Sequence, residues 1–139
     1  MNLDLPVRDL VSPMLRTLRT DQTLSDAWTE MLNGGFHHLP VTQDGQLVGI
    51  LSASDLRAVL RDLPDDIYET GVVLDSSRTV QTLMTPDPVT ITPDAPLREA
   101  FEALATGRYH ALPVTTAGAV VGILTSTDLL RYALSAAST

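Results

Sequence analysis

The chain has 139 residues and a net charge of −8, from nine arginines, no lysine and seventeen acidic residues. This balance argues against a nucleic-acid binder or a protein bound to anionic membranes, because both need clustered positive charge. The absence of cysteine excludes disulfides, a thiolate nucleophile and sulfur-ligated metals. No apolar run approaches the roughly 20 residues of a membrane-spanning helix, and the N-terminus lacks a secretory pattern. We therefore expect a soluble, cytoplasmic protein.

An internal repeat organises the sequence. A shift of 73 residues aligns Val7–Leu60 with Val80–Ala133 without a gap, and 20 of these 54 positions are identical. Such self-similarity indicates a duplicated structural unit. We expect one motif at residues 7–60, a largely solvated linker at 61–79 with a few apolar residues on the surface, and a second motif at 80–133.

Each copy predicts the order strand, helix, strand, strand, helix. Short β-prone stretches, Arg16–Arg19 and Val89–Thr92, come first. An amphipathic helix should follow in each copy, because apolar residues recur three and four positions apart. A capping box at Thr23 to Asp26 and Pro96 in the second copy mark the helix starts. We expect these helices to stop at glycine. In the first copy the apolar residues are Leu24, Ala27, Trp28, Met31 and Leu32, and the stop is Gly34. In the second copy they are Leu97, Ala100, Phe101, Leu104 and Ala105, and the stop is Gly107.

A β-hairpin and a last helix complete each copy. Asp44-Gly45 and Ala117-Gly118 stand between apolar runs, which is a hairpin pattern. The last helices should begin near Ser54 and Thr127. A lone copy would be marginally stable at this size. The sequence therefore predicts an α/β protein, with two motifs packed about a pseudo-twofold axis into one compact module.

The repeated pattern resembles the CBS domain, named after cystathionine β-synthase, and the tandem pair resembles a Bateman module. Histidine, any residue and Leu-Pro-Val are followed by a turn and then by glycine, two apolar residues and Ser/Thr-x-Ser/Thr-Asp. This pattern occurs twice at one separation and covers nearly the whole chain. The resemblance implies two β-α-β-β-α motifs, an adenosine-containing ligand in the clefts between them, a regulatory role and a homodimer.

The resemblance also implies which residues hold the ligand. Asp55 and Asp128 match the aspartate that binds ribose. Neighbouring hydroxyl residues match groups that contact ribose or phosphate, and the segments around the histidines match those that hold adenine. The first-strand stretches around Met14–Leu18 and Asp87–Ile91 match the opposite wall of the cleft. Arg16, Arg57, Arg108 and Arg131 could substitute as phosphate ligands. The remaining candidates are Ser52, Ser54, Thr125, Thr127, His37, His38, His110, Tyr109 and Val89.

The Ser/Thr-x-x-Asp spacing has a second interpretation that needs no ligand. Ser52 with Asp55, and Thr125 with Asp128, fit helix capping boxes. A cap in the empty protein is compatible with ligand contact in the bound one, so both interpretations stay open.

The chain departs from the family where many members carry a phosphate-binding arginine. His38 and Ala111 occupy that position in the two copies. His38 supplies charge only when protonated, so neither copy has a permanent bidentate clamp. Together with the acidic charge, this lowers the expected affinity for ATP relative to that for AMP or for a cationic adenosyl ligand such as S-adenosylmethionine. ADP remains a further candidate.

Three function classes follow from these residues. The first is a ligand-sensing module that regulates a separate partner protein, whose identity the sequence does not reveal. The second is a structural homodimerisation module with vestigial clefts and no nucleotide. The third, an enzyme, is disfavoured, because no nucleophile–base pair or phosphate-binding glycine loop is present. No required cofactor is expected. We also expect no metal site, because neighbouring His37 and His38 on one strand would point to opposite faces.

Overall fold

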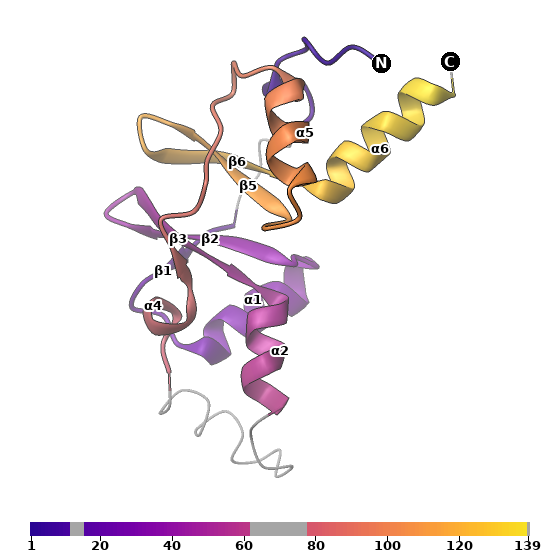
Figure 1. Cartoon of the computed structure of the whole chain (residues 1–139). Helices are drawn as coiled ribbons and strands as arrows, with labels where there is room; N and C mark the ends of the chain where they lie inside the picture. Colours follow the sequence, from indigo (N-terminus) through magenta and orange to yellow (C-terminus); the bar gives the residue numbers. More distant parts are fainter. Residues whose placement is uncertain (12–15, 62–77, 139) are drawn as a thin grey trace. The chain divides into compact units, whose positions relative to one another are not determined.

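The computed structural model describes residues 1–11, 16–61 and 78–138, and it divides into two compact units (Figure 1). The continuous unit is Arg16–Pro88, and the split unit combines Met1–Leu15 with Val89–Thr139. Both units contain helices and strands, which confirms the α/β class. Most of the linker predicted at 61–79 lies outside the described residues. Met14 and Leu15, predicted to begin one wall of the ligand cleft, lie outside them as well.

A four-stranded sheet forms the centre of the continuous unit, in the order β1-β2-β3-β4. β1 runs parallel to β2, and the other two pairs are antiparallel. Helices α1, α2 and α4 contribute buried side chains to its apolar core. The elements are β1 (Leu18–Arg19), α1 (Leu24–Gly34), β2 (His38–Gln43), β3 (Gln46–Ser52), α2 (Ala53–Arg61), α4 (Val80–Leu83) and β4 (Thr85–Pro86).

The split unit is built on one hairpin, β5 and β6, which pairs in the same register and with the same irregularity as β2 and β3. Its core includes Val7 from the chain's first segment, together with buried residues of α5 and α6. The elements are the short 3-10 helix η1 (Val7–Asp9), α5 (Leu97–Ala105), β5 (Ala111–Thr116), β6 (Ala119–Thr125) and α6 (Ser126–Ala137).

The first strand of each copy is shorter than predicted. Only Leu18–Arg19 forms a strand, and the Val89–Thr92 stretch makes a single parallel bridge, from Ile91 to Val114. In each copy the buried residue of this stretch is the apolar one at the same repeat position, Leu18 in the first copy and Ile91 in the second. The exposed flanking residues have nothing apolar to cover, so pairing does not extend along the whole β-prone run.

The two hairpin turns are confirmed. Asp44 and Gly45 have φ of 52° and 80°, and Ala117 and Gly118 have 51° and 82°. Two successive left-handed residues are the signature of a type I′ turn, whose twist suits antiparallel strands. The left-handed conformation is less favourable for Ala117 than for Asp44, the residue at the equivalent position of the first turn.

Helix α1 ends at Gly34, as predicted, and the left-handed cap is the next residue. Gly34 is the last residue of α1, and Gly35 is the left-handed C-cap, with φ of 66°. In the second copy Gly107 does adopt the left-handed conformation, two residues after α5 ends. The repeat has arginine opposite Gly35, so the alignment of the two copies did not identify this second glycine as the cap.

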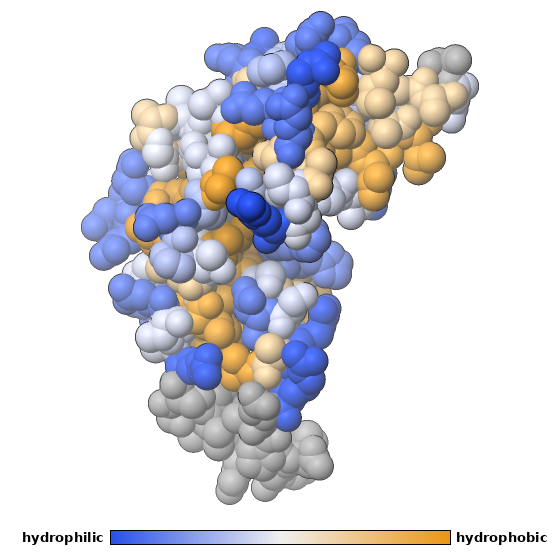
Figure 2. Space-filling view, in the orientation of Figure 1, coloured by the Kyte–Doolittle hydropathy of each residue, from blue (hydrophilic) through white to orange (hydrophobic). Residues whose placement is uncertain are grey.

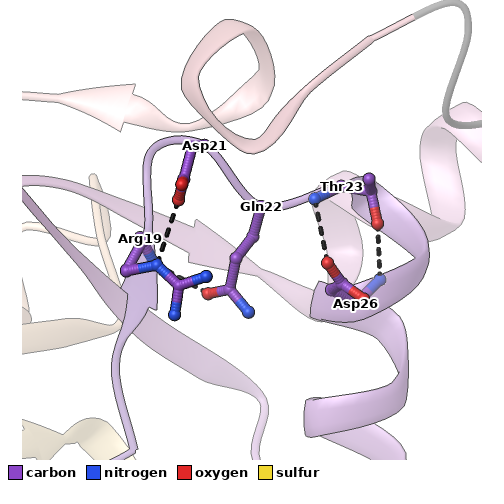
Figure 3. A network of polar contacts seen from close by, with 5 residues as sticks. All are labelled: Arg19, Asp21, Gln22, Thr23 and Asp26. Atoms are coloured by element: carbon purple, nitrogen blue, oxygen red, sulfur yellow. Dashed lines mark hydrogen bonds and ion pairs between the residues drawn. The ribbon is translucent and has the colours of Figure 1, made fainter.

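Polar contacts fix the turn from β1 into α1 (Figure 3). The Arg19 guanidinium lies 3.1 Å from the Asp21 carboxylate, and the Arg19 backbone N–H donates to the Gln22 side chain at 2.8 Å. The predicted capping box is present: the Asp26 N–H donates to Thr23 Oγ1, and the Thr23 N–H donates to the Asp26 carboxylate. These contacts satisfy amides that the first turn of a helix leaves without partners.

The segments that precede the first strands are exchanged between the two copies. Val7 and Val80 are equivalent by repeat, yet Val7 is fully buried in the split unit and Val80 in the continuous unit. Thus each copy's core is completed by the leading segment of the other. In Figure 1, α4 lies beside the sheet of the continuous unit.

Replacing Gly35 by alanine is expected to destabilise the continuous unit by about 1 kcal/mol, because an L-residue pays for the left-handed conformation. No atom lies within 4 Å of the Cβ that would be added, so the loss reports backbone strain alone. Urea denaturation measures it. Asn33→Ala, two residues earlier on an exposed site, is the control and should change stability by less than about 0.5 kcal/mol. Equal stability of Gly35→Ala and wild type would contradict the left-handed cap.

Candidate functional site

Two equivalent sites lie where a hairpin strand runs into a helix: β3 into α2 in one unit, and β6 into α6 in the other. At the first, the Asp55 N–H donates to Ser52 Oγ at 3.0 Å, and the Ser52 N–H donates to Asp55 Oδ2 at 3.0 Å. At the second, the Asp128 N–H donates to Thr125 Oγ1 at 3.2 Å, and the Thr125 N–H donates to Asp128 Oδ2 at 2.9 Å. The capping interpretation of the spacing is therefore confirmed in both copies.

Each cap leaves part of the aspartate available. Asp55 and Asp128 are half-buried, and no described residue donates a hydrogen bond to the Oδ1 atom of either. A carboxylate held by one oxygen at a helix N-terminus can still accept from a ligand hydroxyl with the other. The structure thus allows the cap and the ribose contact together.

The histidine segments lie against these boxes. The backbone carbonyl of His37 accepts from the Ala53 N–H at 2.8 Å, and that of His110 accepts from the Ser126 N–H at 2.9 Å. Ser126 Oγ also donates to the His110 carbonyl, at 3.3 Å. Each unit therefore brings one histidine and one aspartate box together, as the repeated pattern implies. The imidazoles of His37 and His110 are exposed, and that of His38, beside them on β2, is half-buried.

The hydroxyl residue directly before the aspartate of each box is open to solvent. Ser54 and Thr127 occupy the first turns of α2 and α6 and are both exposed. An exposed hydroxyl beside unpaired helix amides is suited to an anion. Tyr109 is different, because it is half-buried and packs against the core of the split unit.

The candidates from the first strands are placed less specifically. Arg16 is exposed, and its guanidinium lies 2.9 Å from the carboxylate of Glu30 on α1. Val89 is 49% exposed and belongs to the other unit. Arg131 is exposed on α6, three residues after Asp128, with no ion pair among the described residues.

A surface hollow on the continuous unit includes two of the residues that the sequence named as ligand candidates, Ser54 and Arg57. Its volume is about 670 Å³, and among the described residues it is lined by Trp28, Ser54, Arg57, Leu60 and Arg61. The signal that could have revealed it is the spacing of Arg57 and Arg61, one turn apart on α2. Trp28, predicted as core, is only partly buried there.

Other kinds of site lack support in the described part of the chain. No three histidine or acidic side chains cluster there as metal ligands would. The helices of residues 1–11, 16–61 and 78–138 also include none with the length and apolar character to cross a bilayer.

Comparison with known proteins places these features in a family. The family model for the CBS domain matches residues 7–62 and 80–135. An A-adding tRNA nucleotidyltransferase of Aquifex aeolicus is 33% identical over 128 residues, which are 91% of this chain but 14% of that protein. A CBS domain-containing protein of Dictyostelium discoideum is 33% identical over 128 residues, 89% of this chain and 88% of its own length.

A solved structure has the same architecture. The structure of CBSX2 in complex with AMP has a TM-score of 0.76 and 29% identity, and the match covers 94% of this chain and 96% of that one. The match of the family model in both repeats is sufficient for assignment: the chain belongs to the CBS domain family, as a tandem pair.

Proposed function

We propose that this tandem pair is a regulatory module that binds an adenosine-containing ligand and, in response, modulates a partner protein. The observation that carries the proposal is the aspartate of each helix-capping box, half-buried, with Oδ1 unpaired among the described residues. A carboxylate in this position can accept the hydroxyl protons of a ribose, as acidic residues do in dinucleotide folds. The AMP bound by the similar CBSX2 structure supports the choice of ligand class.

The surrounding groups suit the rest of such a ligand. Ser54 and Thr127 offer hydroxyls at helix N-termini, where the aligned peptide dipoles favour negative charge. His37, His38, Tyr109 and His110 belong to the segments beside the boxes. We assign Ser52 and Thr125 to the caps, with their aspartates shared between cap and ligand.

The charge of the chain selects among adenosine compounds. Arg16 is already paired with Glu30, and the positions of the family's arginine hold His38 and Ala111. A triphosphate would meet an acidic chain that lacks the family's arginine clamp, so AMP or a cationic ligand such as S-adenosylmethionine is favoured over ADP and ATP. Arg131 is the nearest arginine to the second box along the chain.

Calorimetry with AMP, ADP, ATP, NAD and S-adenosylmethionine tests the proposal. Asp55→Asn and Asp128→Asn keep an oxygen for the cap but lose the charge. We expect binding at the altered box to weaken about tenfold or more, since a charge-assisted hydrogen bond contributes about 1.5–3 kcal/mol. Stability should change little.

The chain supplies a matched control for this experiment. Asp26 makes the same capping box at the start of α1, outside the repeated pattern that runs from histidine to aspartate, and is exposed. Asp26→Asn should therefore leave the ligand affinity unchanged. Binding that is insensitive to both motif aspartates would contradict the proposed role, and absence of heat with all five ligands at millimolar concentration would remove the function.

A second candidate is a structural homodimerisation module without a ligand. The closed capping boxes favour it, because they explain the repeated Ser/Thr-x-x-Asp pattern without a nucleotide. A dimer with no thermal shift from any of the five compounds is the result that would select it. We further propose that the chain forms a homodimer in either case, acts in the cytoplasm on a separate partner, and catalyses no reaction itself.

A further inference from the structure

The hollow beside α2 has the opposite charge to the chain as a whole. Its described lining residues include two arginines, Arg57 and Arg61, and no acidic residue. The chain has seventeen acidic residues against nine basic ones. Arg57 and Arg61 are exposed, and neither has an ion pair among the described residues. The hollow is therefore a local cationic surface on an acidic protein.

Both guanidinium groups come from one face of α2. Ser54, Arg57 and Arg61 stand at spacings of three and four residues, so they follow one another along the same side of the helix. Like charges four residues apart destabilise a helix. The helix dipole favours a cation at Arg61, in the last turn, but offers nothing to Arg57 near the middle. An anion between the two guanidinium groups would relieve their repulsion.

The rest of the hollow offers apolar surface. Trp28 on α1 and Leu60 on α2 form this part of the lining, and both are half-buried. Figure 2 shows hydrophilic and hydrophobic residues side by side over α2. An indole ring and a leucine side chain thus lie next to guanidinium groups, which bind planar anions through paired hydrogen bonds. The volume of about 670 Å³ is in the range of small-molecule sites.

This combination of groups belongs to the first repeat alone. Under the 73-residue shift, Leu130 and Leu134 of α6 take the places of Arg57 and Arg61. The capping boxes with their aspartates are, by contrast, present in both repeats. The hollow is therefore not a feature of the repeated ribose site, although Ser54 borders both.

We propose that the hollow binds a small amphiphilic anion. Its phosphate or carboxylate lies between Arg57 and Arg61, and its aromatic or aliphatic body packs on Trp28 and Leu60. This site is separate from the proposed adenosine site and goes beyond that function. The net charge of −8 does not prevent such binding, because salt screens distant charges over about 8 Å while the two guanidinium groups touch the ligand. A small molecule suits the volume, whereas an acidic protein segment would meet the repulsion of the whole chain.

Trp28 is the only tryptophan of the chain, so its fluorescence reports on this hollow. Phenyl phosphate and benzoate are the amphiphilic probes, and inorganic phosphate and phenol each lack one half of that chemistry. We expect at least one amphiphilic probe to change the emission of Trp28 and to bind about tenfold or more tightly than inorganic phosphate and phenol. Phenol that binds equally well would overturn the role of the arginines, and inorganic phosphate that binds equally well would overturn that of the apolar surface.

Substitution of the arginines identifies the site. Arg57→Gln with Arg61→Gln should weaken binding of the tighter probe about tenfold or more, because charge-assisted hydrogen bonds are lost. Arg78→Gln with Arg98→Gln is the control, since it removes the same charge from exposed positions outside the lining of the hollow. It should leave the affinity nearly unchanged. Equal losses in the two double variants would show that net charge alone governs binding, and would overturn the site.

Asp55→Asn separates this inference from the adenosine proposal. The variant should weaken AMP binding at the first box and leave the titration of Trp28 by the amphiphilic probes unchanged. A titration that is lost in Asp55→Asn would make the hollow part of the adenosine site and overturn a separate one. Absence of binding by both amphiphilic probes at millimolar concentration also overturns the inference, while calorimetry with AMP on the same protein still decides the adenosine proposal.

Discussion

A fragment of residues 80–133, cut at the boundaries of the second repeat, is expected not to fold, whereas a fragment of residues 16–88 should fold alone. The first lacks Val7, which is fully buried in the core of the split unit, and the neighbouring Leu5, Leu10 and Val11 that pack against it. The second retains every buried residue of its own core, including Val80. Loss of a leading segment therefore removes apolar burial that a domain of this size cannot spare.

Backbone hydrogen bonds strengthen this expectation. The N–H groups of Val7 and Arg8 donate to the carbonyls of Ala95 and Pro93, at 2.8 and 3.0 Å. The Leu97 and Arg98 N–H groups donate back, to Leu5 at 2.8 Å and Leu3 at 3.0 Å. The latter two amides belong to the first turn of α5, where the helix itself supplies no acceptor.

Circular dichroism and urea denaturation of the two fragments measure the difference. A cooperative transition is expected for 16–88 and none for 80–133. Addition of a peptide of residues 1–11 to residues 89–139 should restore helix content. Cooperative unfolding of 80–133 by itself would show that the leading segment is dispensable.

Replacing Gly49 by valine is expected to destabilise the continuous unit by about 3 kcal/mol, near the upper end for an overpacked core. A Cβ at Gly49 would lie 2.4 Å from the sulfur of Met84 and 3.0 Å from the backbone carbonyl oxygen of Thr85. The methionine side chain can move, but the carbonyl belongs to the strand pair in which Gly49 opposes Pro86. The valine would therefore push β4 away from β3.

Urea denaturation of the full chain reports the loss, and amide exchange shows whether it is concentrated in residues 78–88. Gln46→Val is the control, because it places the same side chain on the same strand at an exposed site. It should change stability by less than about 0.5 kcal/mol. A Gly49→Val protein as stable as this control would contradict the close approach of β4.

The fold could be predicted from the sequence where one local pattern decided the outcome. Apolar residues at helical spacing located α1 and α5, and Asp44-Gly45 located a hairpin between two apolar runs. Prediction failed where the outcome depended on distant residues. Nothing local at Val7 indicates that its apolar side chain packs in the core of the second copy, because the exchange is decided by tertiary packing.

At the candidate site the sequence located the two capping boxes but left their chemistry open. The spacing Ser52-x-x-Asp55 is compatible with a cap and with a ribose contact, and sequence could not choose. The structure shows the cap, with one carboxylate oxygen left over. The Arg16–Glu30 ion pair joins the segment before β1 to α1, and nothing local in the sequence indicated this contact between residues fourteen positions apart.

The insertion of one unit within the other has a mechanical consequence. The Tyr132 hydroxyl exchanges hydrogen bonds with the backbone of Asn2, at 3.1 and 3.0 Å, so the first residues are held against the last helix. Tension applied through the two ends of the chain would be carried first by these two hydrogen bonds and by the backbone hydrogen bonds between residues 3–8 and residues 93–98. The continuous unit, threaded into the middle of the chain, would bear no load until the split unit had opened.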